Sequence, residues 1–276
     1  MFLHPPPYWG YGLGELVFVG LGLRGLGGLT LEGLERARKA DKVFLELYTS
    51  PISDFSLEDL RRLLGKPPIL LRRADLEEEA GRRVLEAAEK GCAVLMVPGD
   101  PLIATTHIDL RLRALKAGIR VEVVHAASIY SAAPSIAGLQ IYKFGKTVSI
   151  PFPRPNYMPE TPYQVLGENL SRGLHTLLLL DYDAEEGRWM TVREGLQYLQ
   201  TLEERLGGGV ATPERLVVGL AGVGGGDVEI RGGSLRRMLE AEFRLKPQTI
   251  IVPGSLHFVE AEALRVLAGV REEEIR

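Results

Sequence analysis

The chain has 276 residues, of which 45% are hydrophobic and 25% charged, and its formal net charge is -3 at pH 7. A chain of this length can bury a large core and lies near the size at which single cores divide, which predicts two domains. The charge balance excludes a protein that grips nucleic acid phosphates with a concentrated basic face. Cys92 is the single cysteine, which excludes an intrachain disulfide, and no zinc-binding spacing is present, so we expect an intracellular protein without a metal.

Residues 1–15 are predicted to form an extension before the fold. The first fourteen residues contain three consecutive prolines and no Lys or Arg, so they lack the charged start of a secretory signal. No apolar run is long enough to span a bilayer. We therefore expect a cytoplasmic protein that does not bind membranes.

From Leu16 onward, short apolar runs alternate with segments whose apolar residues lie three and four apart, as is typical of βα units around a mostly parallel sheet. Ser56 predicts the N-cap of a helix over 57–64, and Asp75 with Glu78 predicts a capping box for a helix that ends at Gly91. The strands predicted in the first half are Leu16–Val19, Val43–Leu47, Ile69–Leu71, Ala93–Val97 and Val121–Val124.

The second half repeats this alternation. Its predicted strands are Thr147–Ile150, Thr176–Leu180, Leu216–Leu220 and Thr249–Val252. Its predicted helices are Pro162–Ser171, Val192–Leu206, Leu235–Phe243 and Leu256–Leu267. Thr161 is expected to cap the first of these helices, and Thr191 with Glu194 forms a capping box for the second. The fold class predicted is α/β, with mostly parallel or mixed sheets in two domains, 16–140 and 141–276, and a cleft between them.

Two glycine-containing motifs resemble nucleotide-binding motifs, but each is weak evidence for nucleotide binding. Gly20 to Gly25 read as a formal GxGxxG after the first strand, but the following helix starts only after Thr30, so its amides would not point at a pyrophosphate. The motif therefore favours a loop that lets backbone approach a different ligand. The stretch "FGKT", ending at Thr147, lacks the earlier glycine of a phosphate loop and precedes a strand, which excludes that motif.

The stretch "VPGDPLIATTH" places Asp100 at the end of a buried strand, where Pro98, Gly99 and Pro101 restrict its backbone. Such an aspartate is suited to receive donors from a ligand, although a turn aspartate that bonds its own backbone is common. A second Val-Pro-Gly turn precedes His257, and ligands of open α/β sheets bind outside the carboxyl ends of strands. Both turns are therefore candidates for one ligand site.

Of the remaining candidates, His125 and His175 lie at strand edges and favour a structural role. None of the histidines has the spacing of a metal site. Cys92 is expected to be a small buried hydrophobic residue rather than a nucleophile. No catalytic residue is visible in the sequence.

Several blocks resemble the diphthine synthase branch of the tetrapyrrole methylase superfamily. They are "GLGLRGLGGLTLEGLERARKADKVFLELYTS", "PGDPLIATTH", "HAASIYSA", "GLQIYKFGKT", "GLHTLLLLD" and "VPGSLHFVEAEAL", and they extend from about Gly20 to Leu264. The glycine loop and PGDP are shared across the superfamily, whereas "ELYTS", "ATTH" and "IYKFG" are specific to the diphthine branch.

This resemblance implies a homodimer whose subunits bind S-adenosylmethionine. It implies that the enzyme methylates, three times, the amine of a 3-amino-3-carboxypropyl group on a histidine of translation elongation factor 2. The cofactor contacts that it implies are Leu23, Asp100, Ile103, Ser128, Ile129, Leu180, Ala221 and His257. The block around Ala221, "GLAGVGGG", departs from the family's usual Ala-Arg pattern. Lys143 and Lys146 are candidates for the partner of the substrate's carboxylate, or else a solvated pair.

Methyl transfer from a sulfonium to an amine needs orientation more than acid or base strength, so Asp100 is expected to orient the cofactor's amino acid end without an indispensable base. Two alternatives stay open on the residues. One is a corrin or porphyrin methylase of the same superfamily, and the other is a non-catalytic sensor of adenosylmethionine or a nucleotide.

Overall fold

The computed structural model describes residues 14–275 and divides into two compact units, one up to Ser128 and one from Ile129. Helix α6 (Ile129–Ala137) packs against the helix near the carboxyl terminus, so residues 129–140 belong with the second unit. The division predicted from the sequence lies near Ile141 instead. Most of the predicted extension lies outside the described residues, and its last residue, Glu15, begins the first strand.

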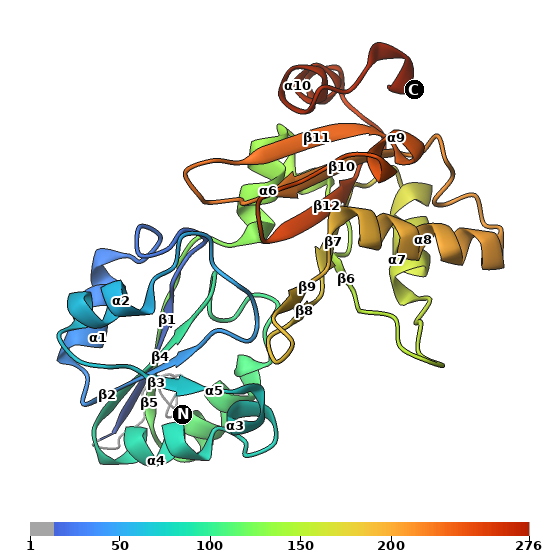
Figure 1. Cartoon of the computed structure of the whole chain (residues 1–276). Coiled ribbons are helices and arrows are strands. Elements are labelled where there is room, and N and C mark those ends of the chain that lie inside the picture. The colour runs from blue at the N-terminus through green and yellow to red at the C-terminus, as the bar shows by residue number, and fades with distance from the viewer. Residues whose placement is uncertain (1–13, 276) are drawn as a thin grey trace, which may run out of the picture. The chain divides into compact units, whose positions relative to one another are not determined.

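The first unit is a parallel sheet with helices on both faces (Figure 1). Its five strands lie in the order β3-β2-β4-β1-β5, and every neighbouring pair is parallel. The strands are β1 (Glu15–Gly20), β2 (Lys42–Glu46), β3 (Ile69–Leu71), β4 (Cys92–Val97) and β5 (Arg120–Val124). The helices are α1 (Leu31–Lys39), α2 (Leu57–Leu64), α3 (Arg73–Glu77), α4 (Arg82–Lys90) and α5 (His107–Lys116).

The unbroken apolar runs of these strands follow from burial of both faces of the sheet. Along β1, Leu16 and Phe18 pack in one core cluster with α4 and α5, whereas Val17 and Val19 pack in a second cluster with α1 and α2. All four side chains are fully buried. The alternation of side chains along one strand therefore serves two cores, and the predicted strands of this unit are confirmed.

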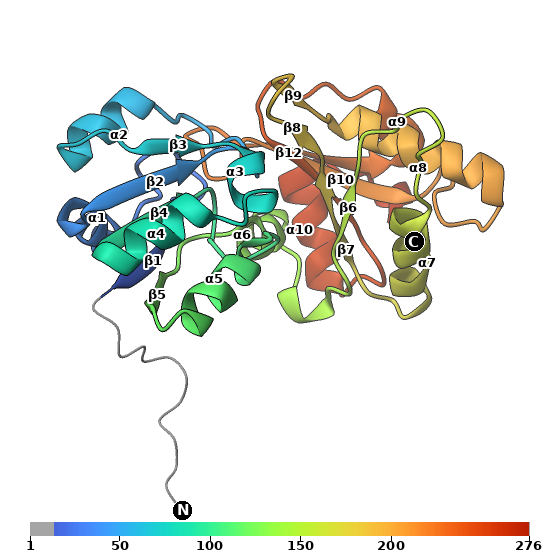
Figure 2. The same cartoon turned by 90° about the horizontal axis from the view of Figure 1, so that it is seen from below.

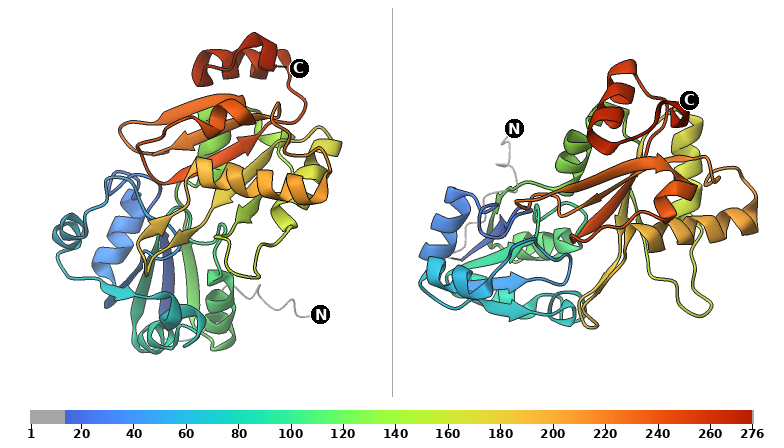
Figure 3. Two further views of the ribbon diagram at one scale, coloured as in Figure 1. Left: turned by 45° about the vertical axis from the view of Figure 1, so that its right-hand side comes forward. Right: turned by 45° about the horizontal axis from the view of Figure 1, so that its top comes forward.

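The second unit is built on a mixed sheet (Figure 3). Its order is β11-β10-β12-β7-β6, and only β6 and β7 are parallel. Its strands are β6 (Val148–Ile150), β7 (Thr176–Leu180), β10 (Leu216–Ala221), β11 (Glu229–Ser234) and β12 (Gln248–Val252), with a hairpin of β8 (Tyr182–Asp183) and β9 (Arg188–Trp189). The α/β fold class is confirmed.

One core cluster of this unit joins the sheet to three helices. They are α7 (Thr161–Ser171), α8 (Val192–Leu206) and α9 (Leu235–Leu239). Helix α10 (Phe258–Ala268) lies on the other side of the sheet from α8, where it packs on β11 and α6 (Figure 1). Two short 3-10 helices, Ile141–Lys143 and Glu272–Glu274, complete the unit. Within residues 14–275, no helix is both long and apolar enough to cross a membrane.

Several helix ends follow directly from the sequence. The Ser56 hydroxyl accepts from the Asp59 N–H at 3.2 Å, and Gly65 closes α2 in the left-handed conformation, as predicted. The Thr191 box is also confirmed, since Glu194 accepts from the Thr191 N–H at 2.8 Å. Each cap satisfies backbone groups that the helix leaves without an intrahelical partner.

Other predicted boundaries were wrong for identifiable reasons. The helix predicted to end at Gly91 is interrupted, because Ala80 and Gly81 adopt positive φ angles of 55° and 67° and separate α3 from α4. Asp75 lies inside α3, where its carboxylate accepts from the Arg72 N–H at 2.7 Å. Thr161 is the first residue of α7 and makes no side-chain cap, since the N-cap position is Glu160.

Strand β11 was missed, and the helix predicted over 235–243 stops at Leu239. The sequence of β11, "EIRGGS", has a single β-branched residue, Ile230, no aromatic residue and two glycines, which is a weak strand signal. A Cβ on Gly232 would lie 2.6 Å from the Val270 side chain, so the close packing of the carboxyl-terminal segment requires this glycine.

A buried carboxylate fixes the start of α10. Glu260 is fully buried and accepts from the N–H groups of Gln140 at 2.9 Å and His257 at 2.8 Å, and from the Lys143 ammonium. Its carboxylate also accepts from His175 Nε2 at 3.1 Å, because His175 Nδ1 accepts from the Gly254 N–H at 2.9 Å and leaves the proton on Nε2. Three segments of the chain, 140–143, the residues around His175 and 254–260, therefore meet at one carboxylate.

These contacts also set the charge states. Burial by itself would raise the pKa of Glu260, but the hydrogen bonds from His257, Lys143 and Gln140 outweigh it and lower the pKa to about 2. Burial lowers the pKa of His175, which stays neutral in agreement with its accepting Nδ1. The ionised form of Glu260 thus stabilises the fold above its ordinary pKa of 4.5, and this contribution is lost as the pH falls toward 2.

We therefore expect Glu260→Gln to lower the free energy of unfolding by about 3 kcal/mol at pH 7, because it leaves the Lys143 charge without its partner. The difference from the parent protein should shrink at pH 3, where part of the native contribution is already lost. Denaturant unfolding at the two pH values measures it. Glu262→Gln, on the exposed face of the same helix, is the matched control and should cost less than about 0.5 kcal/mol. Equal losses in both variants would contradict this account.

Candidate functional site

The carboxyl ends of the parallel strands in the first unit bring four loops to one edge of the sheet. Gly20, the last residue of β1, pairs with Val97 at the end of β4, and the preceding Val19 pairs with Val124 at the end of β5. Strand β2 is the neighbour of β4 on its other side. Because ligands of such sheets bind outside the carboxyl ends of the strands, this edge is the candidate ligand-binding site of the first unit.

The glycine loop after β1 and the PGDP turn after β4 are joined by their backbones. The Gly22 N–H donates to the Gly99 carbonyl at 3.1 Å, and the Gly99 N–H donates to the Gly22 carbonyl at 2.9 Å. A Cβ on Gly20 would lie 2.6 Å from the Gly99 carbonyl oxygen, so only glycine permits this approach. The helix after the loop begins at Leu31, capped by Thr30, which agrees with the expectation that these glycines do not open a dinucleotide-binding helix.

Asp100 is buried and its carboxylate is used within the first unit. One oxygen accepts from the Leu102 N–H at 3.1 Å, and the other contacts His125 Nδ1 at 2.7 Å and the Ala126 N–H at 3.4 Å. Asp100 therefore bonds its own turn, as turn aspartates commonly do, and in addition links that turn to the segment after β5. His125, expected at a strand edge, is its partner.

The other residues expected to bind cofactor in this unit lie in the same loops. Leu23 lies between two backbone bridges, Gly22 to Gly99 and Arg24 to Ser53, which hold the glycine loop against its neighbours. Ile103 follows Asp100 on the PGDP loop and is 42% exposed. Ser128 is buried at the end of the segment after β5, and the next residue, Ile129, begins α6. The structure thus brings together the candidates of the first unit.

The candidates of the second unit form two groups. Leu180 ends β7 and Ala221 ends β10, and both strands are antiparallel to β12, so both residues lie at the Gln248 end of β12. His257 follows the opposite end of β12, and its segment is bonded to the residues before β7 through Gly173 and His175. Within this unit, therefore, His257 is not brought beside Leu180 and Ala221, and the second Val-Pro-Gly turn contributes to a different end of the sheet.

His257 is the N-cap of α10, where its Nδ1 accepts from the Val259 N–H at 3.4 Å. The suggestion that Lys143 pairs with a substrate carboxylate was wrong, because its ammonium is bound to the buried Glu260 and to the Ser255 carbonyl. Lys146 is exposed, and its backbone N–H donates to Asn169. Burial and the neighbouring Glu15 raise the pKa of Cys92 to about 11, so this residue is a neutral thiol rather than a nucleophile.

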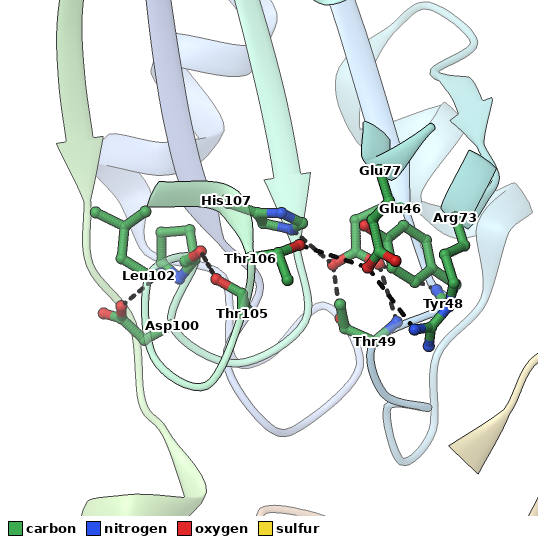
Figure 4. A network of polar contacts seen from close by, with 11 residues as sticks. Glu46, Tyr48, Thr49, Arg73, Glu77, Asp100, Leu102, Thr105, Thr106 and His107 are labelled. Carbon is green, nitrogen blue, oxygen red and sulfur yellow. Dashed lines mark hydrogen bonds and ion pairs between the residues drawn. The ribbon is translucent and has the colours of Figure 1, made fainter. Parts of the chain in front are cut away.

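A polar cluster in the first unit was not predicted from the sequence (Figure 4). Glu46, the last residue of β2, is fully buried, and its carboxylate accepts from the N–H groups of Tyr48 at 3.0 Å and Thr49 at 3.1 Å. It also accepts from the Thr49 hydroxyl at 2.6 Å and contacts His107 Nε2 at 3.2 Å. Four groups therefore satisfy a carboxylate that burial would otherwise make costly.

Tyr48, Arg73, Glu77 and Thr106 surround this buried pair. The Arg73 guanidinium lies over the Tyr48 ring at 5.2 Å and 3.7 Å from the Glu77 carboxylate, and the Thr106 hydroxyl lies 3.5 Å from Glu77. These residues follow β2, β3 and β4, three neighbours in the sheet. The cluster thus joins the "ELYTS" and "ATTH" blocks. Their shared specificity to one branch was a signal in the sequence, but nothing in the spacing indicated that they meet.

The loops also suit a ligand of the kind that the sequence predicts. A Cβ at Gly99 would meet only the Ala127 carbonyl, at 3.9 Å, so the turn leaves open space beside its backbone. The loops that meet here carry backbone donors and acceptors, the Asp100 carboxylate, and the apolar residues Leu23 and Ile103. This combination fits a molecule that carries an amine, a carboxylate and a flat aromatic base, as S-adenosylmethionine does.

Comparison with known proteins gives a consistent result. The family model described as Tetrapyrrole (Corrin/Porphyrin) Methylases matches residues 15–206. The chain is 42% identical to a diphthine synthase of Methanosphaerula palustris over 92% of this chain and 99% of that one. It is 43% identical to a diphthine synthase of Methanocaldococcus jannaschii, over 91% and 98% of the two chains.

Solved structures agree. A crystal structure of diphthine synthase matches with a TM-score of 0.86 and 34% identity, covering 95% of this chain and 99% of that one. A putative diphthine synthase from Entamoeba histolytica matches with a TM-score of 0.84 and 32% identity, covering 92% and 98%. The chain therefore belongs to the diphthine synthases, the branch of the tetrapyrrole methylase family whose members use S-adenosylmethionine as methyl donor in diphthamide biosynthesis.

Proposed function

We propose that this diphthine synthase methylates the amine of a 3-amino-3-carboxypropyl group on a histidine of translation elongation factor 2, and that it adds three methyl groups. The identity to diphthine synthases over more than nine-tenths of the chain supports the substrate. The observation that carries the proposal is the contact between Glu46 and His107, because it joins the two branch-specific blocks next to the loops shared by the whole family.

S-adenosylmethionine supplies an electrophilic methyl carbon on a sulfonium. When bound, it would supply this carbon to the substrate's amine, which would form the N–C bond in line with the breaking C–S bond, whose electron pair would return to sulfur. The amine must be unprotonated, so each of the first two products has to lose a proton before the next transfer. The protein's main contribution is to hold amine and methyl carbon in line at contact distance, which does not require a catalytic triad.

In this proposal Leu23, Asp100, Ile103 and Ser128 of the first unit, with Ile129, hold the cofactor. Their support is that four loops at one sheet edge are linked by the reciprocal Gly22 and Gly99 bonds and by the contacts of Asp100. Leu180, Ala221 and His257 are included on the resemblance to the family. Because Leu180 and His257 lie at opposite ends of β7 and β12, substitution of each one separately tests which end contacts the cofactor.

We expect Asp100→Ala to weaken binding of S-adenosylmethionine at least tenfold, roughly 1.4 kcal/mol, because Leu102 and Ala126 would lose their common acceptor. Isothermal titration calorimetry measures the dissociation constant. Asp109→Ala is the matched control, since Asp109 is an exposed aspartate on the next helix that pairs only with Arg113 among the described residues. Unchanged affinity in Asp100→Ala would show that this carboxylate does not organise the cofactor loops.

The activity itself is tested by incubating the protein with S-adenosylmethionine and elongation factor 2 that carries the 3-amino-3-carboxypropyl group. Mass spectrometry of the modified histidine should show successive gains of one, two and three methyl groups. Elongation factor 2 without this group is the control and should gain none. Methylation that stops at one group, or that occurs equally on the unmodified factor, would contradict the proposal.

We further propose that the protein acts in the cytoplasm as a homodimer that uses α10 as its interface. Val259, Val266 and Leu267 form an apolar stripe on this helix, and they are 51%, 71% and 47% exposed. Phe258, 76% exposed, adds to the same helix. Exposed apolar surface of this kind is expected to be covered by a partner, and a second copy is the partner that the family resemblance implies.

A single charge in this stripe should separate the copies. We expect the parent protein to have the mass of two chains by size-exclusion chromatography with light scattering, and Val266→Glu to have the mass of one, because a buried unpaired charge is costly. Leu31→Glu, at an exposed leucine of α1, is the matched control and should leave the mass unchanged. A parent protein with the mass of one chain would disprove the dimer.

A further inference from the structure

The cluster around Tyr48 contains a donor that the fold does not use. Tyr48 is 5% exposed, and its hydroxyl is buried without a hydrogen-bond partner among the described residues. The Thr106 hydroxyl is near enough to influence the pKa of this phenol, but it does not meet the geometry of a hydrogen bond. A buried hydroxyl without a partner costs free energy, so its position needs an explanation such as a ligand that accepts from it.

The charge state of this hydroxyl defines what it can bind. Burial, with smaller contributions from the Glu46 and Glu77 carboxylates, raises the pKa of Tyr48 above its ordinary value of 10.0. The phenol therefore carries its proton at neutral pH and is a donor. Its complement is an acceptor, and the Arg73 guanidinium over the ring adds positive charge and further donors at the same place.

The Glu77 carboxylate further restricts the kind of ligand that this cluster can bind. Arg73 lies 3.7 Å from Glu77, and their side chains are 55% and 32% exposed, so both are reached by a ligand without breaking a buried pair. A simple carboxylate would meet Arg73 favourably and Glu77 unfavourably. A group with a carboxylate and an ammonium on the same carbon satisfies both charges.

The contact between Glu46 and His107 fixes the position of Tyr48 in this cluster. Glu46 accepts from the backbone N–H groups of Tyr48 and Thr49, and His107 approaches the same carboxylate from α5. The rings of His107 and Tyr48 meet edge to face, with centroids 6.4 Å apart. The Glu46 carboxylate is fully occupied by contacts within the protein, including His107, so these two act as positioning residues. The Tyr48 hydroxyl is the buried group left without a partner among the described residues, and Arg73 is the exposed charge beside it.

From this geometry we propose that Tyr48 and Arg73 bind the carboxylate of an α-amino acid group, whose ammonium or amine faces Glu77. Two molecules of the methyl transfer carry such a group, the 3-amino-3-carboxypropyl side chain of the protein substrate and the methionine part of S-adenosylmethionine. The first source rests on the proposed function, whereas the second rests only on the cofactor of the family.

The test uses Tyr48→Phe, which removes only the hydroxyl, and Arg73→Gln, which removes the charge. Three quantities are measured for each variant: the dissociation constants of S-adenosylmethionine and of its decarboxylated analogue, and the KM for modified elongation factor 2. Tyr142→Phe and Arg82→Gln are the matched controls. Tyr142 is 79% exposed, and Arg82 has an exposed ion pair with Glu79 at 3.7 Å that resembles the pair of Arg73 with Glu77.

We expect each variant to raise the KM for modified elongation factor 2 roughly tenfold with an unchanged dissociation constant of S-adenosylmethionine, which assigns the carboxylate to the protein substrate. A similar rise in the dissociation constant of S-adenosylmethionine, with the decarboxylated analogue unaffected, supports the site and assigns the carboxylate to the cofactor. The control variants should change none of the three quantities.

Two results would overturn the inference. One is that neither the KM nor the dissociation constant of S-adenosylmethionine changes while the parent enzyme is active. The other is that the decarboxylated analogue loses affinity as much as S-adenosylmethionine does, since no carboxylate would then be involved. If the parent enzyme does not methylate modified elongation factor 2, the proposed function fails, and the two dissociation constants still decide whether the site binds a carboxylate.

Discussion

The structure depends on buried carboxylates that are kept ionised or bonded by donors from distant parts of the chain. A carboxylate in a protein interior is tolerated only where several donors converge on it, so each one fixes the relative positions of the segments that supply them. Glu46 does this in the first unit, through Tyr48, Thr49 and His107. Glu260 does it in the second, through backbone and side-chain groups of two other segments, 140–143 and the residues around His175.

The parallel sheet of the first unit places the contacts of Glu46 at the edge where the candidate site lies. Its strands all end at the same edge, so the loops after β1, β2, β4 and β5 collect there whatever their distance in sequence. Loops by themselves would be mobile. Here each loop is bonded to a neighbouring one, through the contacts of Gly22 with Gly99, Gly25 with Ser53, and Glu46 with His107. For an enzyme that works by orientation, this rigidity is the catalytic contribution of the fold.

The two parts of this edge have different chemistry. The glycine loop and the PGDP turn offer mainly backbone groups and apolar side chains, with the Asp100 carboxylate already bonded internally. The cluster around Tyr48 offers a free donor and two opposite charges. Tyr48, Thr49, Thr106 and His107 of this cluster come from the blocks "ELYTS" and "ATTH", whereas its two charges, Arg73 and Glu77, belong to α3.

The sequence alone predicted the α/β class, almost all strands and the caps at Ser56 and Thr191, because these depend on local periodicity and on side chains near the caps. Ile69–Leu71 and Val192–Leu206 match their predicted limits. It also gave the family through contiguous motifs. It did not reveal the break at Ala80 and Gly81, which depends on backbone conformation. It also missed strand β11, in which Gly232 is required by packing against Val270.

Only the tertiary structure decided which polar residues meet. Glu46 and His107 are separated along the chain by two strands and three helices, and nothing in either motif indicates the other. The same holds for Lys143, whose ammonium is bound by Glu260 of a distant helix and is therefore not available to a substrate. Sequence patterns determine elements because helices and strands are local, whereas a hydrogen bond between distant residues exists only once the sheet has brought their loops to one edge.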